Sequence, residues 1–236
     1  MSTETPGEPP AADDPGPVRP LTDAPSGSAP PAGRVWYASY GSNMDDGRLR
    51  YYLAGGRPPG SVRTHPGCRD RSAPERSLPI ELPGVLYFAT ESSAWTGGRG
   101  FYDPGAEGRV WARAHLISTQ QFSDIAAQEM YRLPGADLDL TTVLAEGREV
   151  LGPGRYETLV CPGYLDGLPV LTFTAPWRCA DVEGNKPSAA YLRHLAAGLR
   201  AAGTWDTAAI ARYLAGAPGA AGFWTPDDIR TLLEAA

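Results

Sequence analysis

The chain has 236 residues, of which 42% are hydrophobic, with 24 Pro and 28 Gly, which is typical of one globular domain with long loops or a tail. The formal net charge is −6, so general affinity for nucleic acid or for an anionic membrane surface is not expected, because no excess of basic side chains is available for phosphates. The three cysteines, Cys68, Cys161 and Cys179, have no CxxC spacing. This argues against a disulfide framework or a structural zinc and favours a soluble protein of the reducing cytoplasm.

Residues 1–33 contain Pro, Gly, Ala and acids with almost no large apolar side chains, so they are predicted to be a disordered tail. The remainder, 34–236, is predicted to form one domain. Short β-like runs follow at 35–40, 84–90, 98–103, 110–117, 156–165 and 169–175. Helical periodicity is clear at 44–56, 118–132, 186–203, 206–216 and 225–236. Strands dominate the middle and helices the end, which favours an α+β fold with a curved or barrel-like sheet.

Residues 57–76 are dense in Pro, Gly and Arg, and they are predicted to form a long surface excursion. No internal repeat is visible in the chain.

The first candidate site is the stretch YASYGSNMDD at 37–46. If the strand ends near Tyr40 and a helix follows, Asn43 is a natural N-cap and Gly41 allows a tight turn. The free N–H groups of Gly41, Ser42 and the helix start would form a donor cluster that binds a carboxylate or a phosphate. The alternative is a plain capped connection between a strand and a helix.

The second candidate is the helix predicted at 118–132, which Ser118 and Gln121 start as a capping box. Its apolar face is formed by Phe122, Ile125 and Ala126. Glu129 lies on the same stripe, where burial should raise the pKa of its carboxyl and suit it to proton transfer near neutral pH. The alternative is a Glu at the edge of the stripe that pairs with Arg132.

Two further blocks are weaker. Gly97 and Gly98 follow Trp95, where paired glycines indicate either close approach of a ligand or a hairpin bulge. Pro187 in the first turn of the helix predicted at 186–203 places Tyr191 one turn later, either in the core or in a site.

Other chemistries have little support. The three histidines, His65, His115 and His194, share no ligand spacing, so no metal site is predicted. Cys68 lies in a loop with basic neighbours, but no catalytic partner is visible. The sequence has no GxSxG elbow, P-loop or GxGxxG motif.

Taken together, these blocks resemble the γ-glutamylcyclotransferase-like superfamily, over about residues 35 to 203. The matching blocks are YASYGSNM, Trp95-Thr96-Gly97-Gly98, Val110-Trp111-Ala112, Glu129, and Pro187-Ser188 with Tyr191. Three features depart from the family pattern. Met130 stands where a Gly commonly follows the catalytic Glu, and both the 57–76 segment and the helices after about 204 have no counterpart in compact members.

The resemblance implies a small mixed β-barrel with flanking helices. It also implies a reaction in which the α-amine of a γ-glutamyl group attacks its own γ-carbonyl, leaving 5-oxoproline and a free amine. The implied catalytic acid and base is Glu129, and the implied substrate-binding residues are Tyr40, Gly41, Ser42, Asn43, Gly97, Gly98 and Tyr191. Neither a metal nor another cofactor is needed, because the nucleophile is already tethered.

Two alternatives stay open: a non-catalytic binding or scaffold protein on the same fold, and an amide hydrolase that uses Ser42 or Cys68 as its nucleophile. A histone deacetylase is not predicted, because the His and Asp cluster that a zinc deacetylase needs is missing from the sequence pattern. The leaving amine and the oligomeric state stay undetermined.

Overall fold

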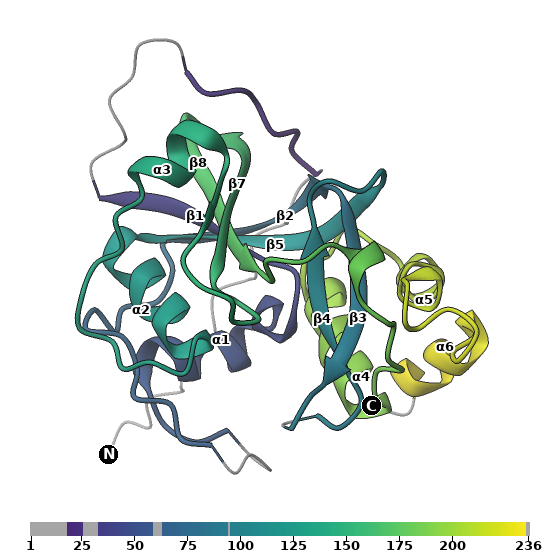
Figure 1. Ribbon diagram of the computed structural model, residues 1–236. Coiled ribbons are helices and arrows are strands. Elements are labelled where there is room, and N and C mark those ends of the chain that lie inside the picture. The colour runs from purple at the N-terminus through teal and green to yellow at the C-terminus, as the bar shows by residue number, and fades with distance from the viewer. Residues whose placement is uncertain (1–17, 26–32, 59–62, 94, 235–236) are drawn as a thin grey trace, which may run out of the picture.

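The computed structural model of the protein describes residues 18–25, 33–58, 63–93 and 95–234 and has a mixed α+β architecture (Figure 1). Its strands are β1 (Arg34–Ser39), β2 (Arg76–Pro83), β3 (Val85–Glu91), β4 (Gly98–Asp103), β5 (Arg109–Ser118), β6 (Arg148–Val150), β7 (Thr158–Leu165) and β8 (Leu168–Thr174). Its α-helices are α1 (Asp46–Ala54), α2 (Thr119–Glu129), α3 (Thr141–Glu146), α4 (Ala189–Ala201), α5 (Thr207–Gly216) and α6 (Pro226–Glu234). Two short 3-10 helices are η1 (Ser42–Met44) and η2 (Cys179–Asp181).

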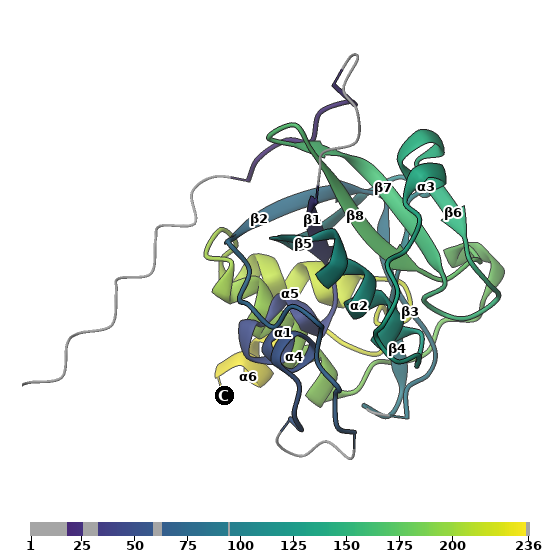
Figure 2. The same cartoon turned by 90° about the vertical axis from the view of Figure 1, so that its left-hand side faces the viewer.

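Six strands form one curved sheet in the order β2-β5-β1-β8-β7-β6, in which β1 and β8 are parallel and the other neighbours antiparallel (Figure 2). The hairpin β3–β4 is separate and lies beside the end of β8, where the Thr174 hydroxyl accepts from Tyr102 N–H at 3.1 Å and donates to Tyr102 C=O at 2.7 Å. The predicted α+β class is confirmed. Within the described residues, the strand ladder itself has two ends rather than closing into a barrel.

Strand β1 is buried on both faces because it lies in the middle of the sheet. Trp36 and Ala38 belong to one core cluster, with the C-terminal helices, whereas Val35 and Tyr37 belong to a second, with α1 and α2. This alternation follows from the two-residue period of a strand. The loop after β1 therefore begins where both cores meet.

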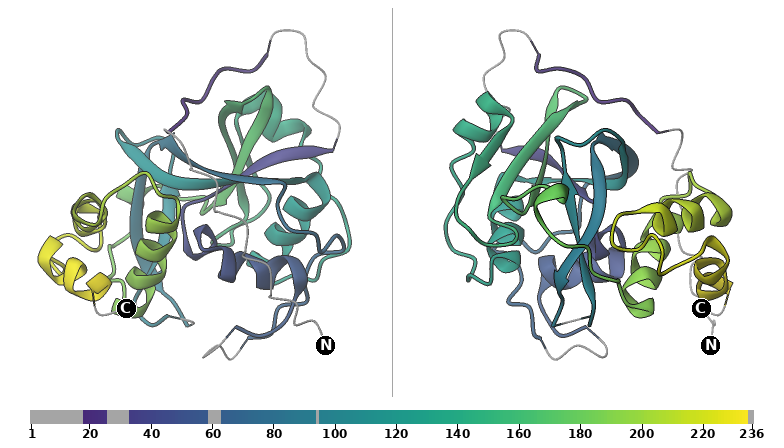
Figure 3. Two further views of the ribbon diagram at one scale, coloured as in Figure 1. Left: turned by 180° about the vertical axis from the view of Figure 1, so that it is seen from behind. Right: turned by 45° about the vertical axis from the view of Figure 1, so that its right-hand side comes forward.

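Helices α4, α5 and α6 pack together at the C-terminal end of the chain (Figure 3). Helix α4 also contacts η1, and a Cβ atom on Gly198 would lie 2.5 Å from Cβ of Met44, so a glycine is required for this close approach. None of the helices in the described part of the chain is long and apolar enough to cross a membrane.

Part of the predicted tail lies against the fold. Thr22 exchanges two backbone hydrogen bonds of 2.9 Å with Tyr164 in β7, and Arg19 forms an ion pair with Asp166. Leu21 packs against the first core cluster. The prediction of a disordered tail is therefore wrong for residues 18–25, and it stays a prediction for 1–17 and 26–32, which lie outside the described residues.

The segment after α1 is also more than a surface excursion. Gly56 and His65 exchange backbone hydrogen bonds of 3.0 and 2.8 Å, and the Cys68 thiol is buried. Arg69 forms an ion pair with the fully buried carboxylate of Asp124 in α2. That prediction is wrong for residues 65–69, which attach the segment to α1 and α2.

Candidate active site

The loop after β1 is a tight 3-10 turn in which Met44 N–H donates to Gly41 C=O at 3.1 Å and Asp45 N–H to Ser42 C=O at 3.3 Å. Helix α1 begins two residues later than expected, at Asp46, because the Asp45 carboxylate caps it by accepting from Arg48 N–H at 2.9 Å. The predicted N-cap at Asn43 is therefore wrong. The structure records no acceptor among the described residues for the N–H groups of Gly41, Ser42 and Asn43.

Instead of capping a helix, the Asn43 side chain is buried and points toward α2. Its Nδ2 donates to Glu129 Oε1 and to the Tyr37 hydroxyl, each at 3.4 Å. Its Oδ1 is buried without a hydrogen-bond partner in the described part of the chain. A buried acceptor of this kind costs free energy unless a ligand donor reaches it.

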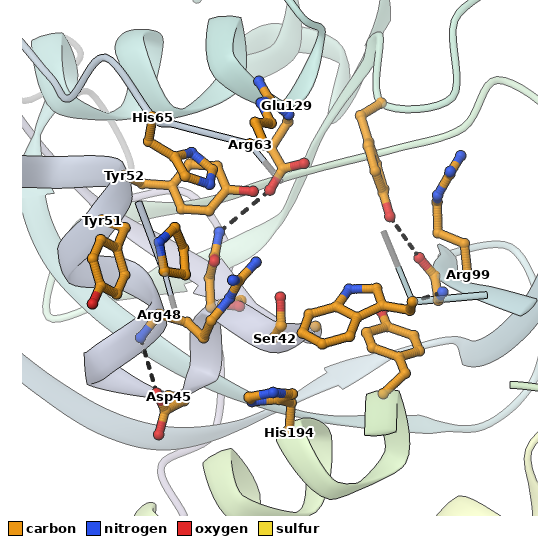
Figure 4. A pocket seen from close by; sticks show the side chains of 18 of the residues that line it. Ser42, Asp45, Arg48, Tyr51, Tyr52, Arg63, His65, Arg99, Glu129 and His194 are labelled. Carbon is orange, nitrogen blue, oxygen red and sulfur yellow. Dashed lines mark hydrogen bonds between the residues drawn. The ribbon is translucent and has the colours of Figure 1, made fainter. Parts of the chain in front are cut away.

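Glu129 is the last residue of α2 and lies on the wall of a cavity (Figure 4). As predicted, the stripe that carries it is buried, with Phe122, Ile125 and Ala126 fully covered. Burial raises the pKa of the Glu129 carboxyl, although a hydrogen bond from Tyr52 and the positive charges of nearby arginines act in the opposite direction. Arg132 pairs with Glu157 rather than with Glu129, so the alternative of a structural Glu129–Arg132 pair is not what the structure shows.

Tyr52 is supported by a histidine that sequence reasoning had weighed only as a metal ligand. The rings of His65 and Tyr52 lie 4.2 Å apart, and burial together with Arg63 and Arg48 lowers the pKa of His65 to about 4. His65 is therefore neutral at physiological pH.

A second neutral histidine holds the loop itself. His115 in β5 is fully buried, with Nδ1 2.7 Å from the Ser77 hydroxyl and Nε2 3.2 Å from Asn43 C=O. Burial and the charge of Arg113 lower the pKa of His115 to about 3. We assign the tautomer from this geometry: Nε2–H donates to the Asn43 carbonyl, and Nδ1 accepts from Ser77.

Three further tyrosines line the cavity. Tyr40 donates to Phe173 C=O at 2.8 Å, Tyr191 accepts from Gly100 N–H at 3.3 Å, and Tyr156 donates to Gly100 C=O at 3.0 Å. Burial raises the pKa of each hydroxyl, so all three are neutral and act by hydrogen bonding and shape.

The cavity has a volume of about 1180 Å³, and more of its lining side chains are positively charged than negatively charged. Its described charged lining consists of the acids Asp45 and Glu129 and of Arg48, Arg50, Arg63, Arg99 and Arg155. In Figure 4, Arg63 lies beside Glu129, whereas Arg99 lies on another side of the cavity. Nε of Arg48 is buried without a hydrogen-bond partner in the described residues. In a chain of net charge −6, this arrangement favours an anionic ligand.

Most of the predicted site residues meet in this cavity. Those that line it are Tyr40, Gly41, Ser42, Asn43, Glu129 and Tyr191.

Gly97 and Gly98 are not part of the recorded lining, and packing explains them. A Cβ atom on Gly97 would lie 2.3 Å from Lys186 C=O, and one on Gly98 would lie 1.9 Å from Asn185 C=O. The absence of side chains at the glycine pair thus allows the backbone that leads into α4 to pack directly against it. The predicted role of the pair in substrate binding finds no support in the geometry.

The sequence alternatives can be tested against the same geometry. Cys68 is buried, and burial raises the pKa of its thiol to about 12, which is unsuited to a nucleophile. Among the described residues, no group of three or more His, Cys, Asp or Glu side chains could hold a metal ion.

Comparisons with known proteins give limited similarity. No protein-family model matches the sequence. Histone deacetylase 5 of Arabidopsis thaliana is 30% identical over 189 residues, which cover 72% of this chain and 28% of that protein. The chain thus spans less than a third of that relative's length.

Solved structures with a similar chain path include an uncharacterized protein from Homo sapiens, with a TM-score of 0.46 and 16% identity, covering 85% of this chain and 98% of that one. They also include a gamma-glutamyl cyclotransferase, with a TM-score of 0.40 and 14% identity, covering 86% and 99% of the two chains.

Proposed function

We propose that the protein is a γ-glutamylcyclotransferase-like enzyme, which converts a γ-glutamyl amine or peptide to 5-oxoproline and a free amine. One observation supports the proposal: a carboxyl with a raised pKa, Glu129, shares a cavity with the amides of residues 41–43, for which no acceptor is recorded among the described residues. Asn43 connects the two, since its amide is in the turn and its side chain bonds Glu129.

In the proposed complex, the N–H groups of Gly41, Ser42 and Asn43 bind the α-carboxylate of the γ-glutamyl group. The α-ammonium lies between Asn43 Oδ1, which needs a donor, and the Glu129 carboxylate. This arrangement holds the nucleophilic nitrogen next to its base, so geometry and proton transfer are what the protein supplies.

The reaction then proceeds in balanced steps. Glu129 takes a proton from the α-ammonium, and the freed amine attacks the γ-carbon to form the ring C–N bond. Glu129 returns the proton to the leaving nitrogen as its bond to the γ-carbon breaks. The ring nitrogen gives its second proton to solvent and the released amine takes one up from solvent, so in all the α-nitrogen loses two protons, the leaving amine gains two, and neither a cofactor nor a second substrate is consumed. A carboxyl with a raised pKa suits both directions of transfer.

Met130 stands where the resembled family commonly has a glycine, which favours the alternative of a binding protein that has lost turnover. The backbone conformation at Met130 weakens that argument. Met130 has φ −78°, a value that every residue adopts, so Gly is not required there. Ser42 lines the cavity and keeps the amide hydrolase open as a third possibility. All three cysteines are free, and a reducing cytoplasm stays part of the proposal.

Product analysis separates the three functions. The protein is incubated with a panel of γ-glutamyl amines and peptides, glutathione included, and the products are identified by mass spectrometry. We expect 5-oxoproline and free amine in equal amounts. Free glutamate would indicate hydrolysis, and a bound but unchanged ligand would indicate a binding protein; either result refutes cyclotransfer.

A further inference from the structure

Helices α1 and α2 are joined at Tyr52, which lines the cavity from α1. Tyr52 is buried, and its backbone carbonyl accepts from Gln128 Nε2 at 2.9 Å. The same carbonyl accepts from the Cys68 thiol, with 3.3 Å between sulfur and oxygen. These contacts fix the backbone of Tyr52 beside the residue that precedes Glu129.

The side chain of Tyr52 reaches Glu129 itself. In Figure 4 its hydroxyl points toward the Glu129 carboxylate, to which it donates a hydrogen bond. The His65 ring lies against the Tyr52 ring, with 4.2 Å between the centroids, so the tyrosine ring has little freedom to move away. A buried and closely packed donor of this kind holds the carboxylate in one orientation.

Glu129 is therefore held by two donors that come from one continuous unit, the 3-10 turn after β1 and the helix that follows it. Asn43 Nδ2, in the turn, lies 3.4 Å from Oε1 of the carboxylate. Tyr52 belongs to α1, which the Asp45 cap starts directly after that turn. The amides proposed to bind the α-carboxylate and the carboxyl proposed to act as base are thus connected by two side-chain contacts.

The Tyr52 hydroxyl acts as a donor in this arrangement and not as an acid. Burial and the negative charge of Glu129 raise the pKa of Tyr52 well above its ordinary value, so the hydroxyl keeps its proton near neutral pH. A hydrogen bond donated to a carboxylate stabilises the ionised form more than the protonated form. Burial favours the protonated form of Glu129, so Tyr52 opposes the effect of burial.

We propose that Tyr52 is a positioning residue that keeps the Glu129 carboxylate ionised and directed toward the α-ammonium of a bound γ-glutamyl group. This inference rests on the proposed role of Glu129 as the base. Tyr52 does not contact the reacting atoms and acts through Glu129.

Two other roles for Tyr52 give different results. A tyrosine that serves only the core tolerates replacement by Phe with no change at Glu129, because the ring is kept. A tyrosine that donates a proton in the reaction lowers turnover at every pH when its hydroxyl is lost, and the titration of Glu129 stays in place. A positioning tyrosine moves the titration of Glu129, and it lowers turnover only at those pH values where the parent's Glu129 is ionised and the variant's is protonated.

The titration of Glu129 also responds to other charged and titratable groups around the cavity. These groups are Arg48 on α1, Arg63 in the segment after α1, Arg155 and Tyr156 in the loop before β7, Tyr37 on β1 and Tyr191 on α4. Replacement of Tyr52 by Phe leaves all of them in place, so a displaced titration is assigned to the one lost hydrogen bond. His65, whose pKa is about 4, titrates as well, and its imidazole signal is followed in the same samples.

The first measurement does not require turnover. The full chain is labelled with ¹³C at the glutamate side-chain carboxyl, and the Glu129 signal is identified by its absence in Glu129→Gln. Its titration is followed by NMR from pH 3 to 9 in the parent, in Tyr52→Phe and in Tyr164→Phe. Tyr164 on β7 is the matched control, because it loses the same hydroxyl outside the recorded cavity lining.

We expect Tyr52→Phe to raise the midpoint of the Glu129 titration by roughly one to two pH units, the size of a hydrogen bond to a charged group. Tyr164→Phe should titrate as the parent. A Glu129 midpoint that is the same in Tyr52→Phe and in the parent would overturn the proposal.

A change in the opposite direction keeps the proposal testable if Tyr52→Phe does not fold. 3-Fluorotyrosine in place of Tyr52 keeps the ring and the hydroxyl, but the fluorine makes the hydroxyl more acidic and therefore a stronger donor. The Glu129 midpoint should then fall below that of the parent. An unchanged or raised midpoint would contradict the proposed role.

Turnover gives a second readout, on a γ-glutamyl compound that the parent converts. The parameters kcat and KM are measured from pH 4 to 9. In Tyr52→Phe the acidic limb of kcat/KM should move up by the same interval as the Glu129 midpoint, while the rate on the plateau stays within about threefold of the parent. A loss of equal size at every pH, with the limb in place, would show that Tyr52 does not act through Glu129.

Failure of the proposed reaction is recognised separately. If the parent converts none of the γ-glutamyl compounds, cyclotransfer is refuted whatever the titration shows. A Glu129 midpoint that rises in Tyr52→Phe would then still support Tyr52 as the residue that keeps Glu129 ionised.

Discussion

Replacement of Glu129 by Gln tests the proposed chemistry most directly. Glutamine keeps the size of the side chain and still accepts from Asn43 Nδ2, which lies 3.4 Å from the carboxylate, but it has no proton to exchange. We expect turnover to fall by roughly a hundredfold or more, the range of general acid–base catalysis, which corresponds to about 2.7 kcal/mol of activation free energy. Substrate binding should persist, because the amides of residues 41–43 are untouched.

The same substitution has a predictable effect on stability, whose sign follows from the raised pKa of the Glu129 carboxyl, relative to an ordinary value of 4.5. Above pH 4.5 the unfolded chain releases this proton before the folded chain does, so the stability of the parent falls as pH rises toward the folded pKa. Glu129→Gln lacks this loss. The variant should therefore be at least as stable as the parent near neutral pH, and its advantage should shrink as pH falls toward 4.5.

Two measurements on parent and variant check these expectations. Turnover is followed by mass spectrometry of 5-oxoproline, and the free energy of unfolding is measured in urea at several pH values. The matched control is Glu146→Gln, the same change at an exposed position of α3. Full activity of Glu129→Gln on a substrate that the parent turns over would refute the mechanism. A variant that unfolds instead would show that Glu129 serves the fold.

Three further predictions concern the loop, its support and the N-terminal segment. Gly41→Val should raise KM at least tenfold, because a Cβ atom at this position points toward the Tyr191 hydroxyl, 3.7 Å away. The melting temperature should change little, because a backbone at φ −115° accepts a β-branched residue. Equal losses of binding and stability would contradict this prediction. His115→Leu should lower both turnover and stability, because it releases the Asn43 carbonyl. The parent should lose stability as pH falls from 6.5 toward about 3, the lowered pKa of His115, and the variant should not show this loss. An unchanged pH dependence of unfolding would refute this. Removal of residues 1–17 should leave the melting temperature unchanged, whereas removal of 1–25 should lower it, because Thr22 pairs with β7; equal melting temperatures would show that this pairing adds no stability.

Much of the secondary structure follows from local pattern. The strand predicted at 98–103 coincides with β4, and the Ser118 capping box starts α2 as expected. Strand β2 was not predicted, because Pro79 and Pro83 are unfavourable in a strand; it forms at the edge of the sheet, where a missing N–H donor is tolerated. Helix α3 and strand β6 are too short, at six and three residues, for periodicity to reveal them.

Those features of the site that follow from the local pattern of one segment could be predicted from the sequence. Contacts between distant segments could not. The apolar stripe of α2 was enough to predict that Glu129 lies on the inner face of the helix, where it lines the cavity; its catalytic role stays a prediction. Asn43 was assigned to a helix cap because the local pattern fits one, but its side chain contacts Glu129, a residue 86 positions later. The arginines of the cavity come from at least four separate segments, so only the tertiary structure reveals that their charges converge.

Met130, which stands where the resembled family commonly has a glycine, does not by itself argue for loss of chemistry, because its φ of −78° is open to every residue. A sequence is expected to break local rules where function requires it. Among the described residues, four non-glycine residues have positive φ, and Tyr131 is the one of them that lines the cavity. Tyr131 contacts two of the cavity arginines, and Asn43 bonds Glu129 in the same cavity. We therefore expect turnover of a γ-glutamyl substrate rather than binding alone, and a ligand that is bound but returned unchanged in the mass-spectrometric assay would refute this expectation.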